Sequence, residues 1–255
     1  MAKTKKPVVA HCFVILLCFQ CNNPAKDKTD MSADTHAFSY NVEKINGSHE
    51  IDADWNKSVW NETPELLLEN FMGDRPDHFP KTRARLRYDD EYIYVIFKVE
   101  DRYIKAVATE TNGRVWQDSC VEFFFSPGED VERGYFNFEA NCKGVYLFQY
   151  HPSDGSKGSF TKEEYDQITI SHSIDRDVTT ESSEPEIWTL EYKIPFDILS
   201  NYIPVDKPKP GTVWRANLYK CADNTSHPHW ITWAPVDHPK PNFHLPEYFG
   251  RLTFE

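Results

Sequence analysis

The sequence predicts an all-β fold, a single antiparallel β-sandwich of jelly-roll type. Three observations support this prediction. Apolar and polar residues alternate with a period of two along the body of the chain, turns with Pro or Gly separate the alternating segments, and no long segment has the 3.6-residue period of an amphipathic helix. Many short strands joined by such turns are typical of antiparallel sandwiches.

Two hairpins are the clearest local predictions. Asp89 and Asp90 separate two alternating segments, and Lys143 and Gly144 separate two others. A short helical turn is expected over 195–200. The predicted strands are 83–88, 92–99, 120–125, 135–141, 145–150, 168–174, 188–194, 214–220, 230–233 and 250–254.

The first 21 residues have the pattern of an export signal. A lysine-rich start precedes the apolar run 8–19, which is too short to span a bilayer. Cys21 follows this run and resembles the lipidated cysteine of a bacterial lipoprotein, although Gln20 stands where a small residue is usual. We therefore expect a signal peptide over 1–21 and a membrane-anchored lipoprotein facing the periplasm or the cell surface. Ordinary cleavage and an uncleaved anchor stay as alternatives.

A polar segment connects this signal to the folded domain. Residues 22–39 are rich in Asn, Lys, Asp, Thr and Ser, as in a flexible tether. No second segment of this kind occurs later, so 40–255 is expected to form one domain. The whole chain has a formal net charge of −12, which disfavours nucleic acid as a partner.

Motifs of common enzymes are absent from the sequence. It contains no G-x-S-x-G, no Gly-rich phosphate loop and no H-E-x-x-H. The carboxylates are numerous enough to include a glycosidase pair, which sequence spacing alone does not reveal. We expect no catalytic residues and no enzymatic activity.

The candidate metal ligands have no diagnostic spacing. Acidic turn residues could supply oxygen ligands to calcium, while a zinc site among the histidines lacks a recognisable pattern. The acidic candidates are Asp89, Asp90, Glu91, Asp101, Asp118, Glu129 and Asp130, and the histidines are His227, His229, His238 and His244. Cys120, Cys142 and Cys221 permit at most one disulfide among them, and the pairing stays open.

Aromatic residues, at 15% of the chain, provide candidates for ligand binding. Sugars present flat C–H faces and rims of hydroxyls, so a sugar site needs aromatic plates and polar groups together. Trp116 precedes a predicted strand and is expected at its edge. Glu122 lies inside that otherwise apolar strand, where a carboxylate needs a ligand or a cationic partner.

Five motifs in order resemble the family 9 carbohydrate-binding modules over about residues 40–255. They are Ile51-Asp52-Ala53-Asp54-Trp55 with Trp60, Tyr88 to Tyr94, Trp116 to Phe124 with its D-x-x-V-E-F-F segment, Trp188 to Phe196, and Phe243 to Leu252. Each motif alone is weak evidence for the family, whereas five motifs in the family's order are specific evidence for it.

The resemblance implies an antiparallel sandwich, non-catalytic carbohydrate binding and structural calcium. In the family two tryptophans clamp a sugar; the first matches Trp116, with Glu122 as the associated carboxylate. Phe243 stands at the second, so a smaller plate is expected there.

Trp230 or Trp233 could serve as that second plate, and Asn141 and Lys143 would supply polar contacts. The implied ligand is a plant or algal type polysaccharide or oligosaccharide, in polysaccharide degradation or uptake.

Two alternatives stay open at this stage. A haem-binding or redox sandwich would need axial His or Met ligands; histidines are available, whereas only Met31 and Met72 remain among the methionines beyond the signal. A glycoside hydrolase is the other alternative.

Overall fold

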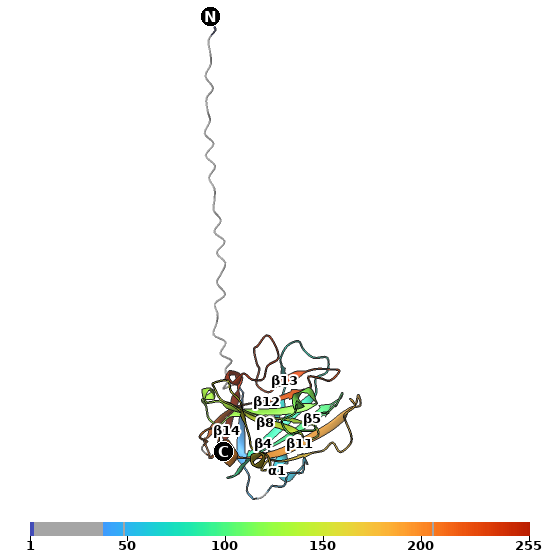
Figure 1. Cartoon of the computed structure of the whole chain (residues 1–255), viewed down its shortest axis with the longest axis vertical. Helices are drawn as coiled ribbons and strands as arrows, with labels where there is room; N and C mark the ends of the chain where they lie inside the picture. The colour runs from blue at the N-terminus through green and yellow to red at the C-terminus, as the bar shows by residue number, and fades with distance from the viewer. Residues whose placement is uncertain (3–37, 48, 206) are drawn as a thin grey trace. The chain divides into compact units, whose positions relative to one another are not determined.

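The computed structural model describes residues 1–2, 38–47, 49–205 and 207–255 of the chain (Figure 1). The residues described from 38 onward belong to one compact unit. Nearly all of the predicted signal peptide, Cys21 and most of the predicted tether lie outside the described residues. Among the helices of the described part, none has the length and hydropathy needed to span a bilayer.

The described strands form a hydrogen-bonded path that divides into two sheets joined at β1 (Ser39–Lys44). The first sheet contains β3 (Asn70–Phe71), β6 (Cys120–Ser126), β7 (Tyr135–Asn141), β8 (Tyr146–His151), β9 (Gly158–Ser159), β12 (Val213–Cys221), β13 (Trp230–Thr232) and β14 (Gly250–Phe254). The second sheet contains β2 (Leu66–Leu68), β4 (Lys81–Tyr88), β5 (Tyr92–Asp101), β10 (Thr169–His172) and β11 (Glu186–Pro195).

Helices are few and short in the described chain. None is longer than four residues, and they occur in the connections between strands. They are α1 (Ser58–Asn61), α2 (Lys162–Tyr165), α3 (Phe196–Leu199) and the 3₁₀ turns η1 (Val115–Gln117), η2 (Val131–Arg133) and η3 (Pro246–Tyr248). The all-β prediction, including the short helical turn after Ile194, is confirmed.

The pairing departs from a purely antiparallel sandwich at one strand. β1 runs parallel to β14 through residues 39–42 and parallel to β4 through Glu43 and Lys44. Every other paired strand in the described part is antiparallel. β1 therefore passes from one sheet to the other and links their edges.

The core lies between the two sheets, because successive residues of each strand face opposite sides. Phe123 and Phe125 of β6 and Phe138 of β7 are fully buried in it, and Phe138 stacks on Tyr192 of β11 with ring centroids 4.1 Å apart. Burial of these aromatic rings is the main stabilising term of the sandwich. The intervening residues of β6 and β7 must then lie on the outer face of the first sheet.

The outer face of the second sheet is covered by the segment 49–60. Glu191 of β11, with no exposed surface, accepts hydrogen bonds there from the backbone amides of Asp52 and Ala53 at 2.9 and 2.7 Å. Trp60 Nε1 and His49 Nε2 reach its other oxygen at 2.9 and 2.6 Å. The motif glutamate of β11 therefore anchors the motif segment 51–55, and its role is structural.

Candidate functional site

A cavity of about 380 Å³ opens on the outer face of the first sheet. Strands β6, β7 and β8 supply its floor, since their outward residues Glu122, Glu139 and Gln149 line it. Its walls come from η1, the end of β12, the start of β13 and the segment before η3. The site therefore depends on the same two-residue alternation that fills the core on the opposite face.

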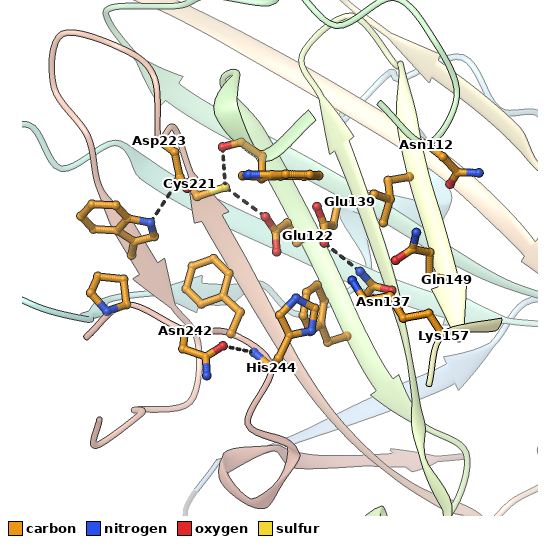
Figure 2. A pocket seen from close by; sticks show the side chains of 16 residues that line it. Asn112, Glu122, Asn137, Glu139, Gln149, Lys157, Cys221, Asp223, Asn242 and His244 are labelled. Atoms are coloured by element: carbon orange, nitrogen blue, oxygen red, sulfur yellow. Dashed lines mark hydrogen bonds between the residues drawn. The ribbon is translucent and has the colours of Figure 1, made fainter. Parts of the chain in front are cut away.

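Two carboxyl groups lie next to one another in the floor. Glu122 of β6 and Glu139 of β7 are direct cross-strand partners, and their side chains are 2% and 5% exposed. Figure 2 shows the two carboxyls side by side in the cavity. Opposed carboxylates on neighbouring strands repel each other when both are ionised.

Burial raises the pKa of Glu122 well above its ordinary value, and the neighbouring Cys221 and Glu139 raise it further. Burial also raises the pKa of Glu139, and this effect is larger than that of the hydrogen bond from Asn137, which lowers the same pKa. The two groups therefore titrate together, and the pair favours retaining a proton. A floor of this kind offers both a hydrogen-bond donor and acceptors to a ligand.

Asn137 fixes the orientation of Glu139. Its Nδ2 donates to Glu139 Oε1 at 2.8 Å (Figure 2). Its Oδ1 accepts from His151 Nε2 at 3.0 Å. Burial lowers the pKa of His151 to about 4, so the imidazole is neutral at pH 7. The second oxygen, Glu139 Oε2, is buried and has no hydrogen-bond partner among the described residues. A buried acceptor without a partner is costly, and a ligand hydroxyl would satisfy it.

Further polar groups stand on two sides of the carboxyl pair. Figure 2 shows Asn112, Gln149 and Lys157 on one side and Asp223 and Asn242 on the other. These amide, ammonium and carboxyl groups offer donors and acceptors in several directions. Such an arrangement matches the rim of hydroxyls on a sugar.

Three aromatic side chains border the same cavity: Trp116, Trp230 and Phe243. Trp116 lies in η1 and is half-buried, so part of its indole stays accessible. The Phe243 ring stacks on Tyr219 of β12, with centroids 4.0 Å apart and planes 11° apart. Tyr219 thus holds one face of Phe243.

Trp230 is oriented by a hydrogen bond from its Nε1 to Asp223 Oδ1 at 2.8 Å. Burial raises the pKa of that Asp223 carboxyl. Four of the predicted site residues, namely Trp116, Glu122, Trp230 and Phe243, therefore meet around one cavity.

The other three predicted site residues lie outside this cavity. Asn141 is fully buried and accepts hydrogen bonds from the Lys143 and Val145 amides at 3.1 Å each, which shapes the β7–β8 turn. Its Nδ2 donates to Asp118 at 2.8 Å. Lys143 Nζ donates to the backbone oxygen of Ile174 at 2.6 Å. The polar atoms of both side chains therefore form hydrogen bonds within the protein, in and around the β7–β8 turn.

Trp233 belongs to the core between the sheets. It is 6% exposed and its ring meets Phe38 edge-on at 6.4 Å. The ring also lies so close to Gly250 that a Cβ there would stand 2.8 Å from it. The Phe-Gly motif at 249–250 therefore makes room for Trp233, which has no accessible plate to offer.

Sequence reasoning missed Glu139, Asn137 and Gln149. The alternation Phe136-Asn137-Phe138-Glu139 does show that the polar residues share one face. It does not show that the segment before η3 folds over that face and turns it into a cavity. Only tertiary structure brings Phe243 to the strands from a position more than 100 residues away in sequence.

The acidic turn residues predicted for calcium already have protein partners in three cases. Asp89 accepts from the Glu91 and Tyr92 amides, and Asp118 accepts from the Val107 and Ala108 amides. Asp101 accepts from His78 and lies 3.5 Å from Lys220 Nζ. These donors use part of the hydrogen-bonding capacity of the three carboxylates. Bound calcium stays a prediction.

The redox and haem alternative keeps one histidine at this site, because His244 lines the cavity, and burial lowers its pKa to about 4. Met72 is 2% exposed and belongs to the same buried cluster as Phe243 and Tyr219, while Met31 lies outside the described residues. The three described cysteines are buried free thiols: Cys120, Cys142 and Cys221.

Comparison with known proteins agrees with the fold. A structure from Bacteroides uniformis, of a proposed carbohydrate-binding protein, is 29% identical over 85% of this chain and 99% of its own, with a TM-score of 0.77. A family 9 module from Caldicellulosiruptor kristjanssonii, solved with cellotriose, is 14% identical over 85% of this chain and 93% of its own, with a TM-score of 0.57.

The same kind of module from that organism, solved with glucose, is 14% identical over 84% of this chain and 95% of its own, with a TM-score of 0.55. A search of curated proteins finds no similar sequence. The model of carbohydrate-binding family 9 matches residues 54–254, which is most of the chain. The resemblance predicted from five motifs is thereby confirmed, and the chain belongs to carbohydrate-binding family 9.

Proposed function

We propose that the cavity on the first sheet binds a sugar unit of an oligosaccharide or polysaccharide without cleaving it. The observation that carries this proposal is the meeting of three aromatic side chains with a buried carboxyl pair in one cavity of about 380 Å³. That volume lies in the range of small-ligand sites. Membership of a carbohydrate-binding family supports the same ligand class.

The aromatic residues would cover the apolar faces of the sugar. Trp116 is the main plate in this proposal, because it is half-buried at the cavity wall and has no ring partner among the described residues. Phe243 is the second plate, held from behind by Tyr219. Trp230 would widen the aromatic surface on the side of Asp223.

The floor would bind the hydroxyl groups. Glu139 Oε2 needs a donor, and a sugar hydroxyl would supply it. Glu122 lies directly opposite and would accept or donate according to which carboxyl holds the shared proton. Hydrogen bonds in such a partly dry site are stronger than in water.

The setting we propose is polysaccharide degradation or uptake, with a plant or algal type glycan as ligand. Glucans are the first candidates to test, because structures of similar fold hold cellotriose and glucose. Export and lipidation of Cys21 belong to the same proposal. They rest on the lysine-rich start and the short apolar run.

A glycan-array screen of the purified chain tests the proposal. We expect binding to a restricted group of neutral glycans and loss of that binding in the variant Trp116→Ala. The bound glycan is then incubated with the protein and its new reducing ends are measured. No release is expected; release that depends on Glu122 or Glu139 would instead establish a hydrolase.

A further inference from the structure

Two thiols and a carboxyl meet beneath the cavity. Cys120 of β6 and Cys221 of β12 are direct cross-strand partners, and Glu122 follows Cys120 on the same face. One potential ligand atom of each residue lies within 4.8 Å of the other two. Cys221 Sγ donates to Glu122 Oε1 at 3.0 Å (Figure 2).

All three side chains are withdrawn from solvent. Cys120 is 0% exposed, Cys221 1% and Glu122 2%. In the described part of the chain, no Lys, Arg or His nitrogen lies within 4.0 Å of the Glu122 or Glu139 carboxyl oxygens. A buried carboxyl without a cation is costly, and the structure offers Glu122 only a weak thiol donor.

The partners of the thiols are also weak. Besides Glu122, Cys221 Sγ reaches the backbone oxygen of Trp116 at 3.5 Å, and Cys120 Sγ reaches that of Val121 at 3.7 Å. Two thiols that face a carboxyl and carbonyl oxygens form an acceptor-rich cluster. The Lys220 ammonium donates to the backbone oxygen of Cys221 at 3.0 Å and lies 3.5 Å from Asp101, and it forms no ion pair with Glu122 in the described part of the chain. Such a cluster is a place where a cation would be stabilised.

We propose that Cys120, Cys221 and Glu122 bind a single zinc-type divalent cation beneath the sugar cavity. Two thiolates and one carboxylate are ligands that zinc accepts, and thiolates exclude calcium and magnesium in favour of softer ions. A tetrahedral zinc with Zn–S bonds of about 2.3 Å has ligand atoms roughly 3.5 to 3.8 Å apart. The observed cluster, within 4.8 Å, needs only small side-chain movements to reach that geometry.

The fourth ligand would come from the cavity. Cys221 and Glu122 line the cavity whereas Cys120 lies behind them, so the cation is open on the cavity side only. A water molecule or a ligand hydroxyl would complete the coordination there. Glu139, opposite Glu122, lies where its partnerless Oε2 could accept a hydrogen bond from that water. The metal site and the sugar site therefore share Glu122, whereas Cys120 belongs to the metal site alone.

Three cysteine positions allow a matched experiment. Cys120→Ser removes one ligand without changing any side chain that lines the cavity. Cys142→Ser is the control, because Cys142 is equally buried and lies outside the cluster. The reduced chain and both variants, each with Cys12, Cys18 and Cys21 also replaced by Ser so that N-terminal thiols cannot bind, are titrated with Co²⁺, whose thiolate complexes absorb in the near ultraviolet and visible, and then with Zn²⁺ as competitor.

We expect one Co²⁺ per chain with thiolate charge-transfer and tetrahedral d–d bands, displaced by Zn²⁺. Cys120→Ser should weaken binding by at least about 100-fold, since even loss of an outer partner costs 10- to 100-fold. Cys142→Ser should bind as the unaltered chain does. If Cys120→Ser does not fold, Glu122→Gln replaces it and is expected to weaken binding in the same way.

Two results would overturn the proposal. One is the absence of thiolate bands from the folded, reduced chain, or their persistence in both Cys120→Ser and Glu122→Gln. The other is a disulfide between Cys120 and Cys221 that forms in the oxidised chain and re-forms in preference to metal binding. Neither result depends on a sugar, so the proposal is tested separately from carbohydrate binding.

Discussion

Glu122 and Glu139 lie directly opposite one another on β6 and β7, and both carboxyls face the same cavity. Burial raises the pKa of each, so the pair favours holding a proton. The pair is almost fully buried, and both aromatic and polar side chains line the cavity around it. This combination gives a floor with donor and acceptor capacity, which hydroxyl-rich ligands require.

The first prediction concerns the buried anchor of the second sheet. Glu191→Ala removes an acceptor that binds the amides of Asp52 and Ala53 and the indole of Trp60. Leaving several buried donors without partners should lower the free energy of unfolding by about 3 to 5 kcal/mol. Urea unfolding of the variant measures this loss.

The matched control for Glu191 is Glu186→Ala on the same strand. Glu186 forms a partly exposed ion pair with Arg176, which contributes about 0 to 1 kcal/mol. An equal effect of the two substitutions would contradict the anchoring role of Glu191.

The second prediction concerns pH. His229 is 2% exposed, and its Nε2 lies 2.8 Å from Lys220 Nζ, with Asp101 and His78 nearby. Burial, and then the charge of Lys220, lower its pKa to about 3. In the unfolded chain His229 binds a proton near pH 6.5, whereas in the folded chain it stays neutral down to about pH 3. The contribution of the neutral His229 to the free energy of unfolding is therefore fully present above pH 6.5 and is lost as the pH falls towards 3.

His229→Gln should therefore flatten the acid side of the stability profile. The slope between pH 6 and 4 should fall by up to about 1.4 kcal/mol per pH unit. Part of the slope should stay, because the pKa of His151 is also lowered, to about 4. Melting temperatures of both proteins across this pH range provide the measurement; parallel curves would contradict a neutral buried His229.

The third prediction concerns calcium. The family resemblance and the acidic turns predict a calcium ion that stabilises the fold. After chelation, added calcium should raise the melting temperature, since an ion at 100 times its Kd stabilises the native state by about 2.7 kcal/mol. Magnesium at the same concentration is the control. An unchanged melting temperature after calcium is restored would count against such a site.

The fourth prediction concerns processing of the N-terminus. Mass spectrometry of the protein from a bacterial host with lipoprotein processing should show loss of residues 1–20 and a lipid on Cys21. Cys21→Ser should prevent lipidation and release the protein from the membrane fraction. A chain that retains Met1 in the soluble fraction would exclude export.

Much of the fold could be predicted from the sequence because it depends on local alternation. The alternating segment 92–99, for example, predicts a strand that lies within the observed β5, Tyr92–Asp101. β1 could not be predicted in this way, because its parallel pairing with β14 and β4 brings together distant parts of the chain. Such pairing leaves no mark on the local pattern.

The site was predictable to a smaller extent, for the same reason. Trp116 and Glu122 were found from one motif, whereas Glu139 becomes a site residue only because β7 pairs with β6 in this register. Trp233 and Trp230 are close in sequence, yet the first packs on Gly250 in the core and the second borders the cavity. The sequence alone does not distinguish these two environments, because they depend on what packs against each face of β13 and its continuation.

The central claim is that Trp116 forms a wall of a carbohydrate site. Replacing Trp116 by alanine removes a half-buried plate, so the melting temperature should stay nearly unchanged. Trp233→Ala is the control. Trp233 lies in the core, so its replacement should lower the free energy of unfolding by about 3 to 5 kcal/mol.

The most direct measurement is calorimetric titration of the unaltered chain and of Trp116→Ala with the best glycan from the array. Loss of one stacking plate should cost roughly 1 to 3 kcal/mol of binding, by analogy with base stacking, which is about a tenfold to hundredfold loss of affinity. Equal affinity of the two proteins, or a large loss of stability in Trp116→Ala, would contradict the account.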